Sequence, residues 1–303
     1  MLTFQELLDG FVEKSRPKVI YRNYCQLRAQ YFHDWVAHPT FLQIEDWHHG
    51  LIKTPHFANS GLWLLKAMYT WAIRRGHHPG PNPATGVKAH RTYSRERVMS
   101  SQEVAHLLQA LDLLPAKLSV LLVVLLTTGC RLSEARQMQP SHLNLLTGAW
   151  LQPHSKTGKP HMTYLSQQAR QAIALLPHSP QYVFDGLPGQ CYSLNGVEKA
   201  WQAVRPMLGL SDVRLHDFRR TFATHLYMAT KDDFLVKRCL NHTNPSVTAI
   251  YVRISQEEVA AAMQAQADRF WALQTQADRL CSLVSAIEVL PALTQSESTT
   301  LTA

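Results

Sequence analysis

Apolar residues recur at helical spacing through most of the chain. Among the first ninety residues, the stretches 42–51 and 61–75 show this spacing. The most regular apolar stripe comprises Leu62, Leu65, Met68, Tyr69 and Ala72. Later segments with the same signature cover about 195–208, 214–229, 232–240 and 245–253. The pattern therefore predicts a mainly helical protein.

Specific residues mark the ends of several predicted elements. Ser100 and Glu103 form an S-x-x-E capping box ahead of an apolar run, which predicts a helix start there. Leu118–Leu126 is too uniformly apolar for a surface helix and is expected to be buried, with Gly129 ending that helix. Residues 148–166 then show the alternation of two short strands around a turn. A small antiparallel hairpin is thus predicted within a mostly helical domain.

One stretch interrupts the apolar pattern. Residues 79–100 are rich in proline, glycine, serine and basic residues, which indicates a linker between two domains. We expect a helical domain over 1–88, a linker over 89–99, a mostly helical mixed α/β domain with a small antiparallel sheet over 100–255, and a C-terminal helix and flexible tail over 256–303. The predicted fold class is mainly α.

The C-terminal segment carries a heptad pattern. Four positions recur every seven residues, and four more follow each of them by three. They are Met263, Phe270, Ala277 and Val284, with Gln266, Leu273, Leu280 and Ile287. Such a seam could fold back on its own domain or pack against a neighbouring protomer.

Composition excludes several classes of protein. The 303 residues are 46% hydrophobic and 17% charged, which rules out wholesale disorder. No apolar run reaches the roughly 18–20 residues that span a bilayer, and acidic residues near the N-terminus argue against a secretory signal. Five widely spaced cysteines without a C-x-x-C motif favour reduced thiols in the cytoplasm. The histidine doublets at 48–49 and 77–78 lack ligand spacing, so we expect them at the surface and assign no metal.

Charge is unevenly distributed along the chain. The formal net charge of +8 divides into +5 over residues 1–93, +7 over 94–255 and −4 over 256–303. Two basic bodies favour a polyanionic partner, which would repel the acidic tail. Positive charge alone does not identify that partner, because many basic proteins bind no nucleic acid.

Four short signatures in the second predicted domain carry the candidate chemistry. Together they supply two guanidiniums, an ammonium, two imidazoles and a phenol. They contribute Arg131, Lys156, His216, Arg219, His242 and Tyr251. Guanidiniums bind nonbridging phosphate oxygens bidentately, and a phenol becomes a nucleophile in a cationic, hydrogen-bonding site. These residue types suit phosphodiester cleavage without a metal.

Each signature also has a plainer interpretation. Arg131 could simply pair with Glu134, three residues later, and Lys159 competes with Lys156 for the role of the ammonium at the hairpin tip. The two histidines could be ordinary hydrogen-bonded side chains, and Tyr251 could belong to the core. Their fixed order along the chain favours the chemical interpretation.

In that order, the signatures resemble the tyrosine recombinase (phage integrase) family over residues 97–255. The preceding helical domain and linker resemble the family's core-binding domain more loosely, in a layout like that of Xer proteins without a separate arm-binding domain. The resemblance implies that six residues are catalytic and that Glu134 supports the first of them. The six are Arg131, Lys156, His216, Arg219, His242 and the nucleophile Tyr251. The family commonly has glycine before the second histidine; Asn241 stands there, and asparagine tolerates the positive φ of a helix-ending turn.

The resemblance also implies a mechanism. Tyr251 would attack a scissile phosphate, forming a 3′-phosphotyrosyl link and releasing a 5′-hydroxyl that Lys156 protonates. His216 would exchange the proton of the tyrosine, and His242 would hydrogen-bond a nonbridging oxygen. The covalent link retains the phosphodiester energy, so the reaction needs no cofactor, ATP or metal. Two rounds of exchange would pass through a Holliday junction.

The partners implied are double-stranded DNA with specific sites, a homotetramer in the synapse and accessory DNA-bending proteins, with no membrane and a cytoplasmic, nucleoid-associated location. The resemblance favours docking of the 257–290 helix on a neighbouring protomer, so truncation at residue 256 is expected to abolish synapsis and spare single-site binding. Two alternatives stay open: a DNA relaxase like type IB topoisomerases, and a domesticated DNA-binding regulator that no longer cuts.

Overall fold

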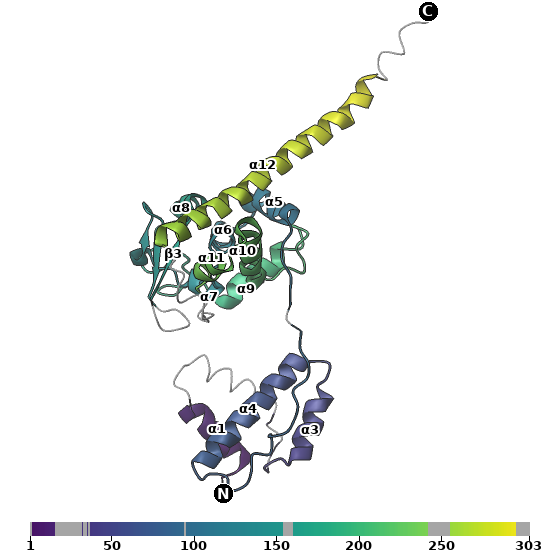
Figure 1. The fold of residues 1–303 in the computed structure, drawn as a ribbon, viewed down its shortest axis with the longest axis vertical. Coiled ribbons are helices and arrows are strands. Elements are labelled where there is room, and N and C mark those ends of the chain that lie inside the picture. The colour runs from purple at the N-terminus through teal and green to yellow at the C-terminus, as the bar shows by residue number, and fades with distance from the viewer. Residues whose placement is uncertain are drawn as a thin grey trace, which may run out of the picture. The chain divides into compact units, whose positions relative to one another are not determined.

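The computed structural model of the chain describes residues 2–15, 32, 35, 37–93, 95–153, 160–241 and 255–294, with side chains described as far as residue 275. The chain divides into two compact units, Met1–Arg95 and Glu96–Ala303 (Figure 1). Helices dominate both, and the second also holds one small antiparallel sheet, which confirms the predicted fold class. No helix of the described residues is long and apolar enough to cross a membrane.

The first unit is a small helical bundle built around α4 (Pro55–Arg74), with α1 (Phe4–Ser15) and α3 (Phe41–Gly50). Proline at the first position of α4 costs nothing there, because that N–H has no intrahelical acceptor. The apolar stripe of α4 that the sequence predicts is buried in the core of the unit. Leu7, Leu8 and Phe11 of α1 pack in the same core.

One histidine of this unit contradicts the prediction that the doublets lie at the surface. His48 is only 2% exposed, its Nε2 lies 3.0 Å from Asn59 Oδ1, and its ring stacks on that of His90 with centroids 4.0 Å apart. Asn59 also donates to the carbonyl of His90 and accepts from its N–H, each at 2.8 Å. The inward face of α3 therefore takes a histidine because polar partners are present to satisfy it.

Both units hold part of the segment predicted as a linker. His90 is bonded to the first unit, as described. Met99 is buried in the second unit, where its N–H donates to Thr221 Oγ1 at 3.0 Å. Arg97 forms ion pairs there with Glu103 and Asp212. The boundary between the two sets of contacts therefore falls between His90 and Arg97.

The second unit surrounds α6 (Ala116–Thr128), the uniformly apolar segment, which is buried as predicted. Around it lie α5 (Ser101–Gln109), α7 (Leu132–Arg136), α8 (Gln167–Ala174), α9 (Leu194–Val204), α10 (Leu215–Thr230) and α11 (Asp233–Cys239), with short 3-10 turns η2 (Leu111–Leu113) and η3 (Pro140–His142). The capping box at the start of α5 forms, because Ser100 N–H donates to Glu103 Oε2 at 2.8 Å and Glu103 N–H donates to Ser100 Oγ at 3.2 Å.

The sheet contains β1 (Leu143–Asn144), β2 (Ala149–Gln152) and β3 (His161–Tyr164), antiparallel and in that order. Strands β2 and β3 confirm the predicted hairpin, whereas β1, with two residues, is too short to leave an alternating pattern. Trp150 pairs with Thr163, and Gln152 pairs with His161. Opposite residues of an antiparallel pair share a face, so these four side chains lie on one side of the sheet.

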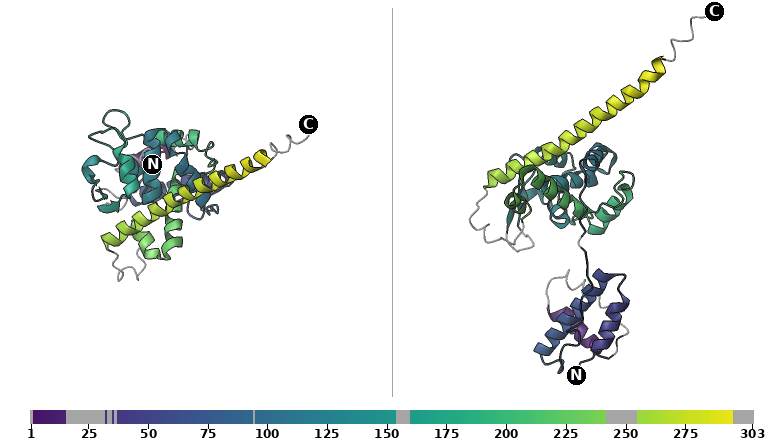
Figure 2. Two further views of the ribbon diagram at one scale, coloured as in Figure 1. Left: turned by 90° about the horizontal axis from the view of Figure 1, so that it is seen from above. Right: turned by 45° about the vertical axis from the view of Figure 1, so that its right-hand side comes forward.

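The last helix, α12 (Gln256–Thr294), packs at first on its own unit. Its residues Val259, Met263, Ala267 and Phe270 are buried, and Phe270 belongs to the same core as α6. Figures 1 and 2 show the helix running along the unit and then extending beyond it. The first half of α12 therefore packs within its own chain, and docking of the helix on a neighbouring protomer stays a prediction.

Candidate active site

The site begins where α6 ends. Gly129 closes α6 with φ of +61°, in the left-handed region. A Cβ at this position would lie 2.4 Å from Phe222 Cδ1 and 2.8 Å from Leu240 Cδ2. Both the backbone conformation and the tight packing therefore require glycine. This turn brings the next residues, Cys130 and Arg131, to the start of α7.

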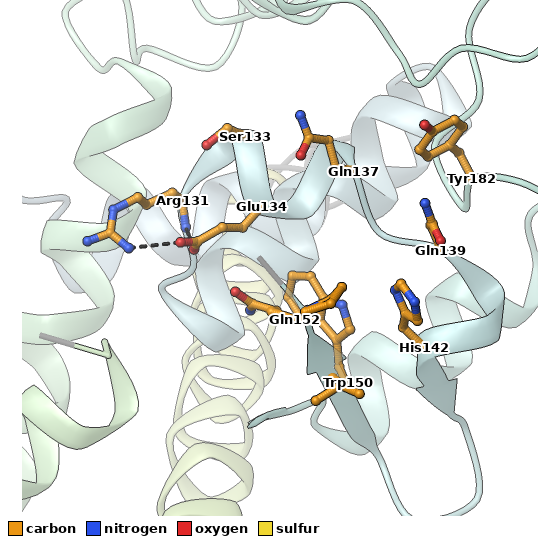
Figure 3. Close-up of a pocket in the computed structure, with 11 residues that line it drawn as sticks. Arg131, Ser133, Glu134, Gln137, Gln139, His142, Trp150, Gln152 and Tyr182 are labelled. Carbon is orange, nitrogen blue, oxygen red and sulfur yellow. Dashed lines mark hydrogen bonds and ion pairs between the residues drawn. The ribbon is translucent and has the colours of Figure 1, made fainter. Parts of the chain in front are cut away.

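Arg131 and Glu134 are joined twice at the start of α7. Arg131 Nη1 donates to Glu134 Oε1 at 2.8 Å, and the Arg131 backbone N–H donates to Glu134 Oε2 at 2.7 Å (Figure 3). The salt bridge considered as the plainer interpretation does form. Because a guanidinium has five N–H donors, this ion pair leaves most of them for an anion. The side chain of Arg131 is 30% exposed, so a ligand can reach it.

Arg219 is held by two backbone carbonyls. It is 7% exposed; its Nη1 donates to the Gly129 carbonyl and its Nη2 to the Leu240 carbonyl, each at 2.7 Å. Burial lowers its pKa, and the positive charge of Arg131 lowers it further, which places the two guanidiniums in one local field. An arginine nevertheless stays charged at neutral pH. The Arg219 side chain thus links Gly129, at the end of α6, to Leu240, the residue before Asn241.

His216 lies on the first turn of α10, three residues before Arg219. Desolvation by surrounding protein lowers its pKa, and the positive charges of Arg220, Arg219 and Arg131 act in the same direction, against Asp217. The neutral imidazole is therefore favoured near pH 7, and it can accept a proton. The neighbouring Asp217 is buried, accepts the Arg214 N–H at 2.8 Å and fixes the start of the helix.

Three of the predicted site residues, Lys156, His242 and Tyr251, lie outside the described residues, as does the predicted helix over 245–253. The structure describes the chain on either side of them. Gln152 and Pro160 flank the hairpin tip, and Asn241 adopts φ of +51°, the conformation that the sequence predicted for it. The turn where glycine is common in the family is thus made by asparagine.

A cavity of about 400 Å³ opens beside Arg131, between α7 and the sheet (Figure 3). Its lining is mostly polar and comprises Arg131, Ser133, Glu134, Gln137, Gln139, His142, Trp150, Leu151, Gln152, Pro153 and Tyr182. Only Arg131 and Glu134 among them belong to the sequence motifs. The other lining residues come from α7 and its C-cap, from η3 and nearby turns, and from β2, all too short for a sequence pattern to single them out.

His161, the first residue of β3, is also close to the site and was missed. Burial lowers its pKa to about 4, and the positive charges of Arg238, Arg219 and Arg131 contribute, opposed by Glu134. Its imidazole therefore belongs to the same electrostatic environment as the two arginines. The signal in the sequence was weak: a single histidine just after the basic hairpin tip.

A cysteine nucleophile is disfavoured at this site. The Cys130 side chain is buried, and burial raises the pKa of its thiol to about 12. Since the thiolate is the reactive form, this sulfur is inert at neutral pH. Among the described residues, no group of histidine, cysteine and acidic side chains could hold a metal ion.

Comparison with known proteins identifies the family. The sequence model of the phage integrase family matches residues 97–258, more than half of the chain and all the described parts of the site. The chain belongs to the phage integrase family. It is a tyrosine recombinase, of the class of enzymes that cleave and rejoin DNA.

Relatives of this recombinase extend the match beyond that region. The tyrosine recombinase XerC of Yersinia pestis is 26% identical over 215 residues, which cover 67% of this chain and 70% of XerC. XerC of Pseudomonas putida is 25% identical over 227 residues, covering 71% of this chain and 74% of the relative.

Solved structures show that the recombinase has the integrase fold. A lambda integrase dimer bound to a COC′ core site superimposes with a TM-score of 0.66 at 19% identity, covering 84% of this chain and all of that one. The Tn1549 transposon integrase in complex with circular intermediate DNA gives 0.62 at 15% identity, covering 87% and 99%. A lambda integrase tetramer bound to a Holliday junction gives 0.67 at 18% identity, covering 84% and 81%.

Proposed function

We propose that this chain is a site-specific recombinase in which Tyr251 cuts DNA and forms a 3′-phosphotyrosyl intermediate. The observation that carries the proposal is the convergence of Arg131 and Arg219. Each is locked from a different direction, Arg131 by Glu134 and Arg219 by the carbonyls of Gly129 and Leu240. Two fixed guanidiniums in one field form a site for a phosphodiester anion.

The arginines would stabilise the charge that develops on the nonbridging oxygens as phosphorus becomes five-coordinate. Their value lies in being fixed before the reaction, because no reorganisation is then needed in the transition state. Glu134 acts through Arg131, whose guanidinium it orients. Loss of one such preorganised donor typically slows catalysis by about 10²–10³-fold.

The remaining roles concern protons and the covalent bond. The phenol oxygen of Tyr251 attacks phosphorus and the bond to the 5′-oxygen breaks. Lys156 gives that oxygen a proton, His216 receives the proton of the tyrosine, and His242 hydrogen-bonds a nonbridging oxygen. The lowered pKa of His216 supports its role as proton acceptor, since the neutral imidazole is favoured at pH 7. Attack by the 5′-hydroxyl of a partner strand reverses these steps.

The assembly we propose is a homotetramer on two specific double-stranded DNA sites, at the nucleoid, with accessory DNA-bending proteins where the sites require them. A tetramer on a Holliday junction is the state of the lambda integrase structure compared above. The first half of α12 is occupied within its own unit, so the protomer contact is assigned to the second half. Its seam positions in the sequence are Ala277, Leu280, Val284 and Ile287.

Covalent trapping on a nicked suicide substrate tests the cleavage reaction. The chain should form a protein–DNA adduct, Tyr251→Phe should bind the same DNA without forming it, and Tyr227→Phe, a change at an exposed tyrosine of α10, should behave as the unaltered chain. An adduct with Tyr251→Phe contradicts the assignment of the nucleophile. Relaxation of supercoiled DNA that carries no paired sites would indicate a relaxase instead.

A further inference from the structure

The inward face of the hairpin carries polar groups that the proposed mechanism does not use. His161 at the start of β3 lies opposite Gln152 at the end of β2, on the face that also presents the buried Trp150 and Thr163. This face meets the proposed phosphate site, because Trp150 and Gln152 line the same cavity as Arg131, and the charges of Arg131 and Arg219 act on the His161 imidazole. His161 therefore lies next to the arginines without belonging to the sequence motifs.

Hydrogen bonds at this face are incomplete. Gln152 is 6% exposed and its Nε2 donates to Thr163 Oγ1 at 2.9 Å, whereas its Oε1 is buried and has no partner in the described structure. Neither ring nitrogen of His161 has a hydrogen-bond partner among the described residues. Buried polar atoms are almost always bonded, so the unbonded Gln152 Oε1 points to a missing partner, and the half-buried His161 ring is free to bind a ligand.

Three other histidines of the chain have a ring nitrogen within hydrogen-bond distance of a protein oxygen, as expected for a structural role. His38 Nε2 lies 2.8 Å from the Leu2 carbonyl, and His48 Nε2 lies 3.0 Å from Asn59 Oδ1. In the second unit, His225 Nε2 lies 3.0 Å from the Met99 carbonyl. Each of these rings is fixed by a protein acceptor. His161 lacks such an acceptor among the described residues, although it is partly buried.

Arg238 supplies a second cationic group at this place. It lies in the last turn of α11, is exposed, and forms no ion pair with any residue that the structure describes. A cavity of about 290 Å³ is lined by both Arg238 and His161, together with Tyr164 and Gln256. Among the neighbouring charges, that of Arg238 has the largest effect on the imidazole. The two side chains thus face a common space.

We propose that Arg238 and His161 form a second phosphodiester subsite, which binds the phosphate adjacent to the scissile one on the same DNA strand. The inference rests on the proposed function, which assigns Arg131 and Arg219 to the scissile phosphate. Arg238 contributes a permanent charge. His161 contributes a hydrogen bond, and its cross-strand neighbour Gln152, which has an unbonded oxygen, would accept from the other ring nitrogen.

Binding at this subsite is coupled to a proton. In the free protein burial is the main cause of the lowered pKa of His161; the charges of Arg238, Arg219 and Arg131 lower this pKa further, and Glu134 opposes them. A bound phosphate adds a negative charge, which raises the pKa of His161. The imidazole then takes up a proton from solvent. Affinity for DNA should therefore rise as the pH falls, by at most about tenfold per pH unit from this one group.

Neutral methylphosphonate groups in the DNA provide the sharpest test. Full-length chain, Arg238→Met and His161→Asn are compared on duplexes whose scissile phosphate, or either phosphate beside it, is replaced singly. Lys199→Met on α9 and His106→Asn on α5 are matched controls at exposed positions outside the cavity. On unmodified DNA, Arg238→Met should bind about tenfold more weakly and reduce the slope of log K against log salt by about 0.9.

The decisive result is the loss of that difference on one modified duplex. If the phosphate beside the scissile one is neutral, the unaltered chain and Arg238→Met should bind equally well. Equalisation only at the scissile phosphate, or at no position, overturns the second subsite. For His161→Asn, the affinity ratio to the unaltered chain should grow toward low pH, and a ratio that is flat with pH overturns the proton coupling.

Adduct formation, measured in parallel, separates this inference from the proposed function. Suppose that the unaltered chain forms the Tyr251 adduct on unmodified DNA. If Arg238→Met and His161→Asn then bind and cut this DNA as well as the unaltered chain at every pH, the subsite alone is refuted. A chain that forms no adduct on any duplex refutes the proposed function instead.

Discussion

At the scale of single residues, Arg219 determines how the site is assembled. Its guanidinium is bonded to the carbonyls of Gly129 and Leu240, two positions more than a hundred residues apart in sequence. The same side chain therefore orders the end of α6, the end of α11 and the site between them. Arg131 is held instead by one carboxylate, that of Glu134.

Replacement of Arg219 by lysine should show this double role. A single ammonium cannot span both carbonyls with the planar fork of a guanidinium, so one buried acceptor is left unbonded, at a cost of about 1–3 kcal/mol. We expect a lower Tm and a loss of cleavage of at least about 10²-fold. The matched control is Arg170→Lys, because Arg170 also donates to two loop carbonyls, those of Leu145 and Leu146.

A single methyl group at Gly129 should also disrupt the site. Gly129→Ala combines positive φ with a Cβ placed 2.4 Å from Phe222, so both strain and overlap destabilise the fold. Gly209→Ala has positive φ as well, but its Cβ meets nothing within 4 Å. The difference in unfolding free energy between the two variants measures the overlap alone. Equal destabilisation would show that φ strain accounts for the whole effect.

The pattern along the chain predicted some of these residues and not others. The order of the motifs predicted that Arg131 and Arg219 are site residues, because residue type and spacing are enough to suggest their chemistry. Nothing in the sequence predicts that Arg219 is held by backbone carbonyls, since any residue supplies that acceptor. His161 and Gln152 became visible only through strand register, which requires knowing how β2 and β3 pair. The charge that acts most on His161 comes from Arg238, 77 positions later in the chain.

At the scale of elements, α12 has two parts with different surroundings. Its first half completes the core of the second unit through Val259, Met263 and Phe270. Its second half extends beyond the unit (Figure 1). The heptad pattern continues through both halves. It therefore predicts an apolar face along the helix, but it does not show which half packs on its own unit.

Two truncations should separate these parts. A chain ending at Ser255 loses three large buried side chains worth about 1.5–3 kcal/mol each, which approaches the whole stability of a domain. We expect it to unfold or aggregate, contrary to the expectation that truncation at 256 spares DNA binding. A chain ending at Thr275 should keep its Tm and its single-site affinity and lose assembly of the synapse. Thermal unfolding and gel-shift assays measure both, and intact synapsis in the shorter chain would contradict our assignment of the protomer contact.

At the scale of the whole molecule, two units with separate cores are joined through residues 91–95. The first unit has its own core of α1, α3 and α4, and the second is organised around α6. The net charges are +5 over residues 1–93 and +7 over residues 94–255, so both regions are attracted electrostatically to DNA. Affinity for a site should then arise from two tethered binding surfaces.

Separate production of residues 1–95 and 96–303 should yield two folded proteins, each with a cooperative thermal transition. Each should bind DNA more weakly than the whole chain, and the salt slope of the whole chain should exceed that of residues 96–303, because phosphate contacts add. Equal slopes would mean that the first unit makes no phosphate contacts.

The anchoring of Arg219 by backbone oxygens has a consequence for evolution and engineering. A carbonyl acceptor is supplied by every amino acid, so position 240 can change its side chain without removing the hydrogen bond that positions the guanidinium. The hydrogen bond itself is thereby independent of the side chain at position 240, where the remaining constraints are the packing of the buried Leu240 and the steric demand at Gly129. Where packing is kept, substitutions that adapt the protein to new DNA targets can therefore be tolerated close to the proposed phosphate site.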